Sequence, residues 1–303
     1  MLRITADVYS GLTNPVVDIT DEGEARALLR ELQQDPSLLS DAATADGNLG
    51  FRGFQVDPLS DEIAQDFDIT TGLYLPARAL QRGGRAPEIA ERLLDLMERG
   101  EAPAALEGAT PLDGELKEYV LEHLQSSGTE TAEDQTAPPS PDQEEAAAVC
   151  TYDLSVFNPG FWNNDANVRA NNNCYNYASN WRTNTFAQPG RGCGHMYTAI
   201  SCSEVSRGAL CDGMHRRFNC FPDSEKPRYL VALVIAPGPG FRDYHWFRKQ
   251  SGGFWGHKPG GTAARNTDNS GVLITNPETA NRGPYTQFCG YFYGCNSQRQ
   301  RIR

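Results

Sequence analysis

Residues 171–182 read NNNCYNYASNWR, and residues 243–259 read DYHWFRKQSGGFWGHKP. Asn172 or Asn173 is a good helix N-cap, because a side-chain oxygen there can accept a backbone N–H of the first helical turn. The first stretch therefore predicts a helix that begins near Cys174. The positive end of the helix dipole lowers the pKa of a thiol in this position and favours the thiolate, so Cys174 is a candidate nucleophile.

The second stretch predicts a β-hairpin, with an aromatic strand on each side of a three-residue turn over residues 250–252. With this turn centred on Ser251, His245 lies opposite His257 on one face of the sheet, with Cβ atoms roughly 5 Å apart. His245 is then a candidate general base, and His257 is the residue that orients its ring. Asp243 is a second candidate for the orienting role.

This order of residues resembles a known family. A Cys at a helix start, then a His on one strand and a polar residue, often a second His, on the next strand is found in NlpC-type and CHAP-type cysteine peptidases. The resemblance covers residues 150–295 and implies a papain-like helix packed on an antiparallel sheet. These families have a small residue after the Cys, where this chain has Tyr175.

The resemblance implies a hydrolase of a peptide or other amide bond, either a cell-wall peptidase or a toxin or effector. In that hypothesis Cys174 attacks the carbonyl carbon. His245 takes the thiol proton and later protonates the leaving amine, while His257 holds the ring of His245 in place. The partner would be a peptide or amide-containing substrate.

A second resemblance favours a different hypothesis. The segment HWFRKQSGGFWGHKPG, residues 245–260, resembles a stretch of insoluble shell-matrix proteins. The chain would then be a non-catalytic matrix module, or a carbohydrate- or protein-binding module, that has no need of Cys174. Aromatic faces suit sugar rings and partner proteins. The residues expected to form such a surface are Tyr244, Trp246, Phe254, Trp255 and the tail over 285–293.

The two halves of the chain differ in net charge. Residues 1–149 hold 10 Lys and Arg and 30 Asp and Glu, a balance of −20, and residues 150–303 hold 17 and 9, a balance of +8. Opposite charges attract over about a Debye length, so the halves can dock on each other, or the basic half can bind a polyanion. Simple solvation of each surface is the alternative.

Composition divides the chain into three parts and predicts a two-domain α+β protein. Residues 1–125 form an acidic α/β domain that regulates or delivers the other domain. Residues 126–149 form a flexible linker, since they are rich in Glu, Thr, Pro, Ser and Ala and lack large apolar side chains. Residues 150–303 form the Cys-rich second domain, in which the apolar run RYLVALVIA at 228–236 predicts the centre of a sheet.

Within the first domain, patterning predicts three strands and three helices. Apolar and polar residues alternate over residues 2–9, and strands are also predicted at 16–19 and 50–56. Helices are predicted to start after the N-cap Asp21, at Pro87 and near Leu116.

All eight cysteines lie in the second half. Four of them recur every nine residues, and their spacing fits no zinc ribbon or finger with short Cys-x-x-Cys pairs. We therefore expect disulfides or buried thiols, no metal site and no cofactor. The four cysteines and the histidines between them are Cys193, His195, Cys202, Cys211, His215 and Cys220.

No apolar run approaches the roughly 20 residues that a membrane helix needs, so we expect no membrane span. The first ten residues lack the basic start and apolar stretch of a secretory signal. The expectation is a chain that is cytoplasmic or exported by a signal-independent route and that has no specific nucleic-acid partner.

Overall fold

The structure is a computed structural model that describes every residue except 41–46, 105, 107, 127–150 and 217–221. The chain divides into two compact units, which we consider separately. The first unit comprises Met1–Tyr9, Thr13–Asp46 and Gly50–Glu130. The second comprises Ser10–Leu12, Gly47–Leu49 and Thr131–Arg303. Both units combine helices with an antiparallel sheet, which confirms the predicted α+β class.

The first unit contains a four-stranded antiparallel sheet in the order β2-β1-β3-β4. Its strands are β1 (Leu2–Asp7), β2 (Val16–Ile19), β3 (Gly53–Pro58) and β4 (Leu73–Pro76). The apolar side chains of the predicted alternation, Leu2, Ile4 and Ala6, are all buried. The three predicted strands are confirmed, whereas β4 is an additional strand that patterning did not reveal.

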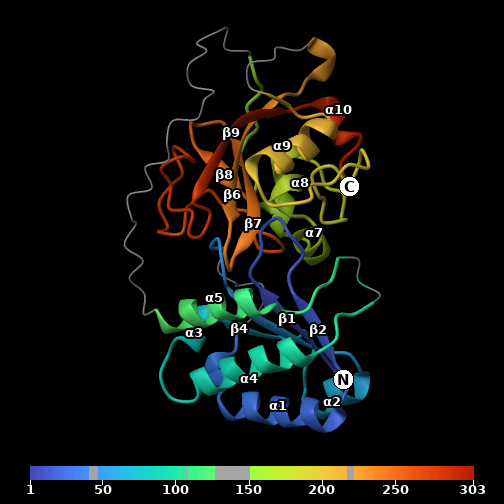
Figure 1. Cartoon of the computed structure of the whole chain (residues 1–303), viewed down its shortest axis with the longest axis vertical. Helices are drawn as coiled ribbons and strands as arrows, with labels where there is room; N and C mark the ends of the chain where they lie inside the picture. The colour runs from blue at the N-terminus through green and yellow to red at the C-terminus, as the bar shows by residue number, and fades with distance from the viewer. Residues whose placement is uncertain (41–46, 105, 107, 127–150, 217–221) are drawn as a thin grey trace. The chain divides into compact units, whose positions relative to one another are not determined.

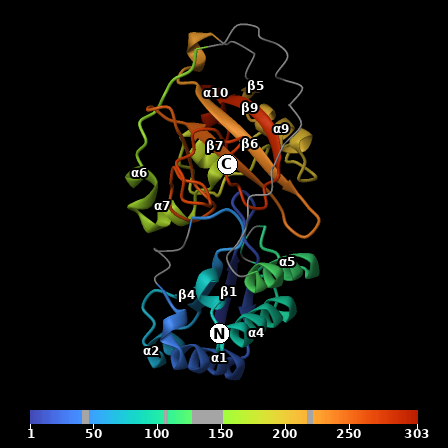
Figure 2. The same cartoon turned by 90° about the vertical axis from the view of Figure 1, so that its left-hand side faces the viewer.

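Five α-helices and a short 3₁₀ helix complete the described part of the first unit. They are α1 (Glu22–Gln34), η1 (Pro36–Leu38), α2 (Asp61–Asp66), α3 (Ala77–Leu80), α4 (Ala86–Arg99) and α5 (Gly114–Gln125). Asp21 caps α1 as predicted, because its carboxylate accepts the Glu24 N–H at 2.7 Å. Helices α1 and α4 lie side by side in Figures 1 and 2, joined by an ion pair between Glu31 and Arg92.

The second unit contains a five-stranded sheet in the order β5-β9-β6-β7-β8. Its strands are β5 (His215–Arg216), β6 (Tyr229–Pro237), β7 (Arg242–Lys249), β8 (Trp255–His257) and β9 (Gln287–Gly294). Its helices are α6 (Gly160–Asn163), α7 (Ala166–Ala170), α8 (Cys174–Ser179), α9 (Cys202–Cys211), the 3₁₀ helix η4 (Asp223–Glu225) and α10 (Asn296–Arg299). The predicted central strand is confirmed as β6, which runs between β7 and β9 (Figure 2).

Both faces of this sheet are covered. Helices α8 and α9 pack on one face, against Val231, Leu233 and Ile235 of β6 (Figure 1). Aromatic side chains such as Phe247 and Tyr285 lie on the other face. Eight of the nine residues of β6 are therefore buried, which explains why its sequence is an unbroken apolar run.

The hairpin turn lies one residue later than predicted. It is closed by the hydrogen bond from Gln250 N to Phe254 O, at 2.9 Å, and both Gly252 (φ 94°) and Gly253 (φ 87°) adopt the left-handed conformation. The centre is therefore Gly252 and not Ser251. As a result, the residue directly opposite His257 is Phe247, so the predicted register, which placed His245 there, is wrong. The prediction that the two rings lie on the same face and contact each other is confirmed.

The described cysteines confirm the expectation of disulfides and buried thiols. Disulfides join Cys193 to Cys211 and Cys202 to Cys289, so both ends of α9 are cross-linked. Cys174 and Cys295 are free and buried. Cys150, Cys220 and residues 127–149 of the predicted linker lie outside the described residues.

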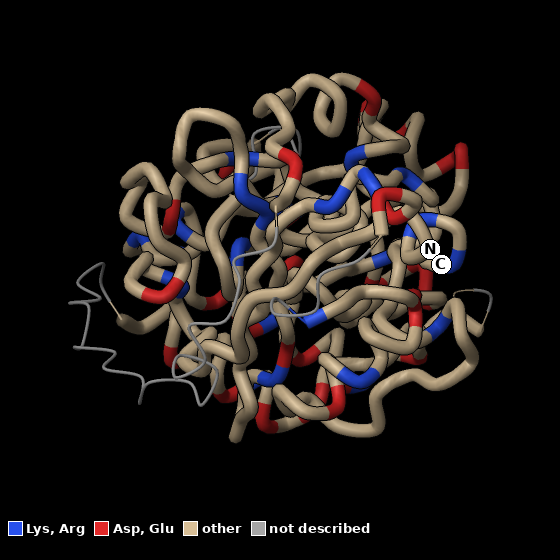
Figure 3. Tube along the Cα trace, turned by 90° about the horizontal axis from the view of Figure 1, so that it is seen from above, with Lys and Arg blue, Asp and Glu red and all other residues tan. Residues whose placement is uncertain are grey.

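Acidic and basic residues are interspersed along the trace in Figure 3. Many charges of the first unit are paired locally, as in the ion pairs from Lys117 to Asp95 and Glu98. Docking of an acidic accessory domain through charge stays a prediction. In the part of the chain that the structure describes, no helix has the length and apolar character needed to cross a membrane.

Candidate functional site

Cys174 is the first residue of α8, as the sequence predicts. The side chain of Asn173 accepts the N–H groups of Tyr175 and Asn176, at 3.1 and 3.2 Å. The side chain of Asn176 in turn accepts the Asn173 N–H at 3.2 Å, which completes a capping box. The local prediction of a capped helix start is therefore correct.

The thiol of Cys174 is nevertheless not a poised nucleophile. The residue is 0% exposed, and its sulfur lies 3.9 Å from the carbonyl oxygen of Tyr244. Burial raises the pKa of Cys174 well above its ordinary value, and the nearby Asp243 carboxylate raises this pKa further. The neutral thiol is favoured because desolvation outweighs the effect of the short helix.

The two histidines form a buried hydrogen-bonded pair. His245 Nε2 and His257 Nδ1 lie 2.9 Å apart, and His257 Nε2 lies 2.9 Å from the Thr267 carbonyl oxygen. A carbonyl only accepts, so His257 Nε2 carries a proton and, in the neutral ring, Nδ1 accepts from His245. The two rings meet diagonally across the hairpin, because a shift of two residues in register keeps both on the same face.

Cys174 and His245 lie on opposite sides of strand β7. Cys174 packs in the cluster that contains Tyr244 and Trp246, whereas His245 contacts Phe247 on the other face. Successive side chains of a strand alternate between the faces, so a residue between Tyr244 and Trp246 points away from α8. The predicted pairing of this nucleophile with this base is therefore not formed.

Asp243, the reserve orienting residue, holds a chain segment within the same unit. Its buried carboxylate accepts the N–H groups of Ser10 at 2.5 Å and Leu12 at 2.9 Å, and also bonds to Gly11 N–H. The hydroxyl of Tyr285 donates to it at 2.5 Å. Burial raises the pKa of Asp243, and these donors oppose that rise. The geometry assigns Asp243 to loop anchoring and not to His orientation.

The expected aromatic surface is also not where the sequence placed it. Tyr244, Trp246, Trp255 and Tyr285 are buried, because both faces of the sheet are covered. Exposed aromatic side chains instead lie on elements that precede the sheet: Phe161 of α6 is 41% exposed and Trp181 is 47% exposed.

A pocket of about 230 Å³ adjoins Phe161, and we call it the Arg248 pocket. Its wall is partly aromatic and partly made of hydroxyl and amide side chains, and a guanidinium group completes the lining. The lining residues are Ser155, Val156, Asn158, Phe161, Trp162, Asn180 and Arg248. Of its two asparagines, Asn158 belongs to no motif identified from the sequence, and Asn180 lies in residues 171–182, which predicted only the helix at Cys174.

One arginine lines the Arg248 pocket, and a second, Arg182, stacks on its wall residue Phe161. Arg248 is 3% exposed, donates to the Tyr177 carbonyl and lies with its guanidinium carbon 4.4 Å from the Tyr177 ring centre. Arg182 lies 3.4 Å above the ring of Phe161. Neither arginine forms an ion pair with any carboxylate among the described residues, and the buried Nε of each has no hydrogen-bond acceptor there. Burial lowers the pKa of Arg248, but a guanidinium stays charged in proteins.

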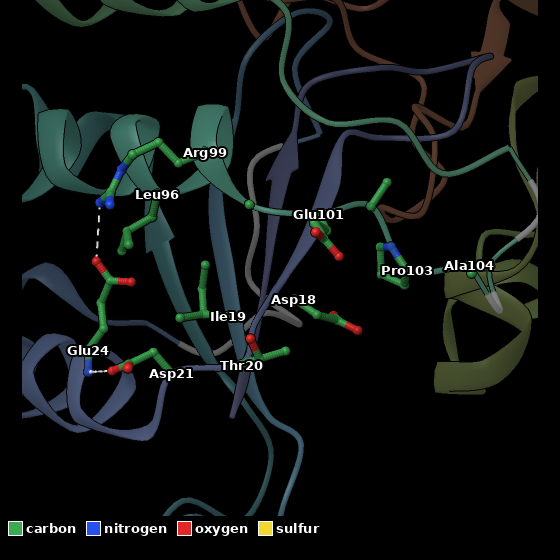
Figure 4. Close-up of a pocket in the computed structure, with 12 residues that line it drawn as sticks. Asp18, Ile19, Thr20, Asp21, Glu24, Leu96, Arg99, Glu101, Pro103 and Ala104 are labelled. Carbon is green, nitrogen blue, oxygen red and sulfur yellow. Dashed lines mark hydrogen bonds and ion pairs between the residues drawn. The ribbon is translucent and has the colours of Figure 1, made fainter.

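A second cleft, of about 480 Å³, lies in the first unit and is acidic (Figure 4). Its carboxylates are mostly engaged by the protein. Glu24 pairs with Arg99 at 3.1 Å, and Asp21 caps α1, as the dashed lines in Figure 4 mark. Asp18 pairs with Arg3 at 2.8 Å. The cleft is therefore less suited to a ligand than the Arg248 pocket.

Comparison with known proteins gives one informative relative. Insoluble matrix shell protein 1 of Ruditapes philippinarum is 46% identical to this chain over 147 residues. The aligned region spans 93% of that protein and 48% of this chain. This chain belongs to the insoluble matrix shell protein 1 family. Neither the family models nor the solved structures give a match.

Membership of the insoluble matrix shell protein 1 family corrects one prediction. The sequence was interpreted as an NlpC-like or CHAP-like cysteine protease, with hydrolase, toxin and effector as related roles. That interpretation is wrong, because the relative is named as a matrix protein and not as a protease. The alternative, a non-catalytic matrix module, fits the relative better. The burial of Cys174 and its separation from His245 agree with this correction.

Proposed function

We propose that this chain is a non-catalytic matrix protein that binds an acidic polysaccharide in the Arg248 pocket. The observation that carries the proposal is the guanidinium group of Arg248 in the pocket lining, together with that of Arg182, which stacks on the lining residue Phe161. Neither group forms an ion pair among the described residues. No carboxylate among the described residues neutralises these two positive charges, so an anionic ligand can supply the missing negative charge.

The charge of the ligand follows from these arginines. A buried charge is costly unless it is paired, and guanidinium groups bind carboxylate and sulfate oxygens through charge-assisted, often bidentate, hydrogen bonds. Arg248 uses one bond on the Tyr177 carbonyl, which leaves donors for a ligand. The net charge of +8 over residues 150–303 would also attract a polyanion.

The sugar character of the ligand follows from the rest of the wall. Phe161 presents exposed aromatic surface in this wall, which suits the apolar face of a sugar ring. Ser155, Asn158 and Asn180 offer hydroxyl and amide groups that can bind sugar hydroxyls.

The test is calorimetric titration of the full chain with a chondroitin sulfate hexasaccharide and, separately, with neutral chitohexaose. We expect the sulfated sugar to bind more tightly, and its affinity to fall as salt rises. Arg182→Gln should weaken binding about 10-fold or more, since a charge-assisted hydrogen bond contributes about 1.5–3 kcal/mol. Phe161→Ala should weaken binding about 3- to 10-fold through lost ring contact.

Lys226→Gln is the matched control, because it removes one positive charge from an exposed side chain that does not line the pocket. It should bind the sulfated sugar as the wild type does. Equal affinity for both sugars, or equal loss in Lys226→Gln and Arg182→Gln, would refute the proposal.

A further inference from the structure

The folding of the second unit brings together three side chains that are far apart in the sequence. His215 belongs to β5, Glu225 is the last residue of η4, and Cys295 follows directly after β9. One ligand atom from each, a ring nitrogen, a carboxylate oxygen and the sulfur, lie within 4.8 Å of one another. We propose that these three residues bind a zinc ion.

The three ligand types favour zinc over other common cations. Zinc binds histidine nitrogen, carboxylate oxygen and cysteine sulfur, whereas calcium and magnesium prefer oxygen ligands alone. Three protein ligands leave a fourth tetrahedral position for water. His215 and Glu225 are partly exposed and Cys295 is buried, so the ion has a route from solvent and a protected sulfur ligand.

The distances are close to those that a bound ion requires. With zinc bonds of about 2.0–2.3 Å, ligand atoms in a tetrahedral site lie roughly 3.5 Å apart. Since no two of the three atoms are more than 4.8 Å apart, the most distant pair needs to approach by about 1.3 Å at most, which side-chain rotation can provide. The backbone around them is fixed, because His215 pairs with Tyr293 in the sheet and Cys295 is the N-cap of α10.

Neighbouring groups orient the proposed ligands. Glu225 Oε2 accepts both the backbone N–H of Ser297, at 3.0 Å, and its hydroxyl, at 2.8 Å. Such outer contacts hold a ligating carboxylate in place. The thiol of Cys295 donates weakly to the Tyr293 carbonyl at 3.5 Å, and zinc would replace the thiol proton. The ion would then join β5, η4 and the start of α10.

The test uses the full chain with its disulfides intact, treated with a chelator and then titrated with zinc by calorimetry. We expect one equivalent to bind, and Co²⁺ in its place to show a thiolate-to-cobalt charge-transfer band. Cys295→Ala should remove that band and weaken zinc binding more than 100-fold. Ser297→Ala, which keeps all three ligands, should weaken binding about 10- to 100-fold.

Cys174→Ala is the matched control, since it removes the other free buried thiol among the described residues and should leave zinc binding unchanged. Glu225→Gln provides a second variant if Cys295→Ala unfolds, and it should also weaken binding. A wild type that binds no zinc, or equal binding by wild type and Glu225→Gln, would overturn the proposal. So would a cobalt complex without the thiolate band.

Discussion

Acid should destabilise this fold through His257. The imidazole is buried, with Nε2 bonded to the Thr267 carbonyl and Nδ1 bonded to His245. Burial lowers the pKa of His257 to about 3. The Thr267 carbonyl opposes this change, and the charge of Arg265 adds to it. The ordinary pKa of histidine, about 6.5, applies in the unfolded chain.

The size of the effect follows from these two pKa values. The folded pKa is the lower one, so between about pH 6.5 and pH 3 the unfolded chain binds a proton that the folded chain does not. The stability contributed by the neutral ring is therefore complete above pH 6.5 and is lost as the pH falls. At about 1.4 kcal/mol per pH unit, the loss between pH 7 and pH 5 is about 2 kcal/mol.

Urea unfolding at pH 7 and pH 5 measures this loss in the wild type and in His257→Gln. Glutamine can still donate to the Thr267 carbonyl but does not titrate. Carboxylates contribute to both proteins and cancel in the comparison. The free energy of unfolding of the variant should fall about 2 kcal/mol less than that of the wild type. The same fall in both proteins would refute a buried, neutral His257.

Two further predictions concern the buried groups of the second unit. Cys174 should react with iodoacetamide at pH 8 at least about 100-fold more slowly in the folded protein than in urea, because burial keeps the thiol protonated and inaccessible. Mass spectrometry locates the labelled cysteine, and rapid labelling of Cys174 in the folded protein would contradict this prediction. Asp243→Asn should lower the free energy of unfolding by about 3 kcal/mol, because an amide NH₂ would face the donors Ser10, Gly11, Leu12 and Tyr285. The exposed control Asp223→Asn should change stability by less than about 0.5 kcal/mol, and similar losses in both variants would contradict the anchoring role.

The sequence predicted those features that depend on neighbouring residues. The cap at Asn173, the buried strand β6 and the glycine-containing hairpin each have a local cause, and all three are present. The predicted register of the hairpin is wrong, because the turn is centred one residue later than predicted. Both Gly252 and Gly253 take the left-handed conformation there.

The failed site predictions depended on tertiary packing. Successive side chains of β7 point to opposite faces of the sheet, so His245 and Trp246 lie on different faces. Cys174 is separated from His245 because its helix, α8, packs on the Trp246 face. The pattern of apolar and polar residues in a strand does not reveal which face of the sheet a helix from elsewhere in the chain will cover. The aromatic residues of the hairpin were expected at the surface because nothing in their own sequence reveals that both faces of the sheet are covered.

The proposed zinc ligands were missed for a similar reason. His215, Glu225 and Cys295 do not form a short metal-binding motif, and the chain brings them together only through the pairing of β5 with β9 and the placement of η4. The expectation of disulfides, in contrast, is confirmed for three of the regularly spaced cysteines, since Cys193 pairs with Cys211 and Cys202 pairs with Cys289.

The ligand proposed for the Arg248 pocket can be located by a crystal structure of the chain with a bound chondroitin sulfate hexasaccharide. We expect a sulfate or carboxylate oxygen at hydrogen-bonding distance, about 3 Å, from the guanidinium of Arg248 or Arg182, and a sugar ring against Phe161. A sugar bound elsewhere on the protein, with the Arg248 pocket unoccupied, would contradict this expectation.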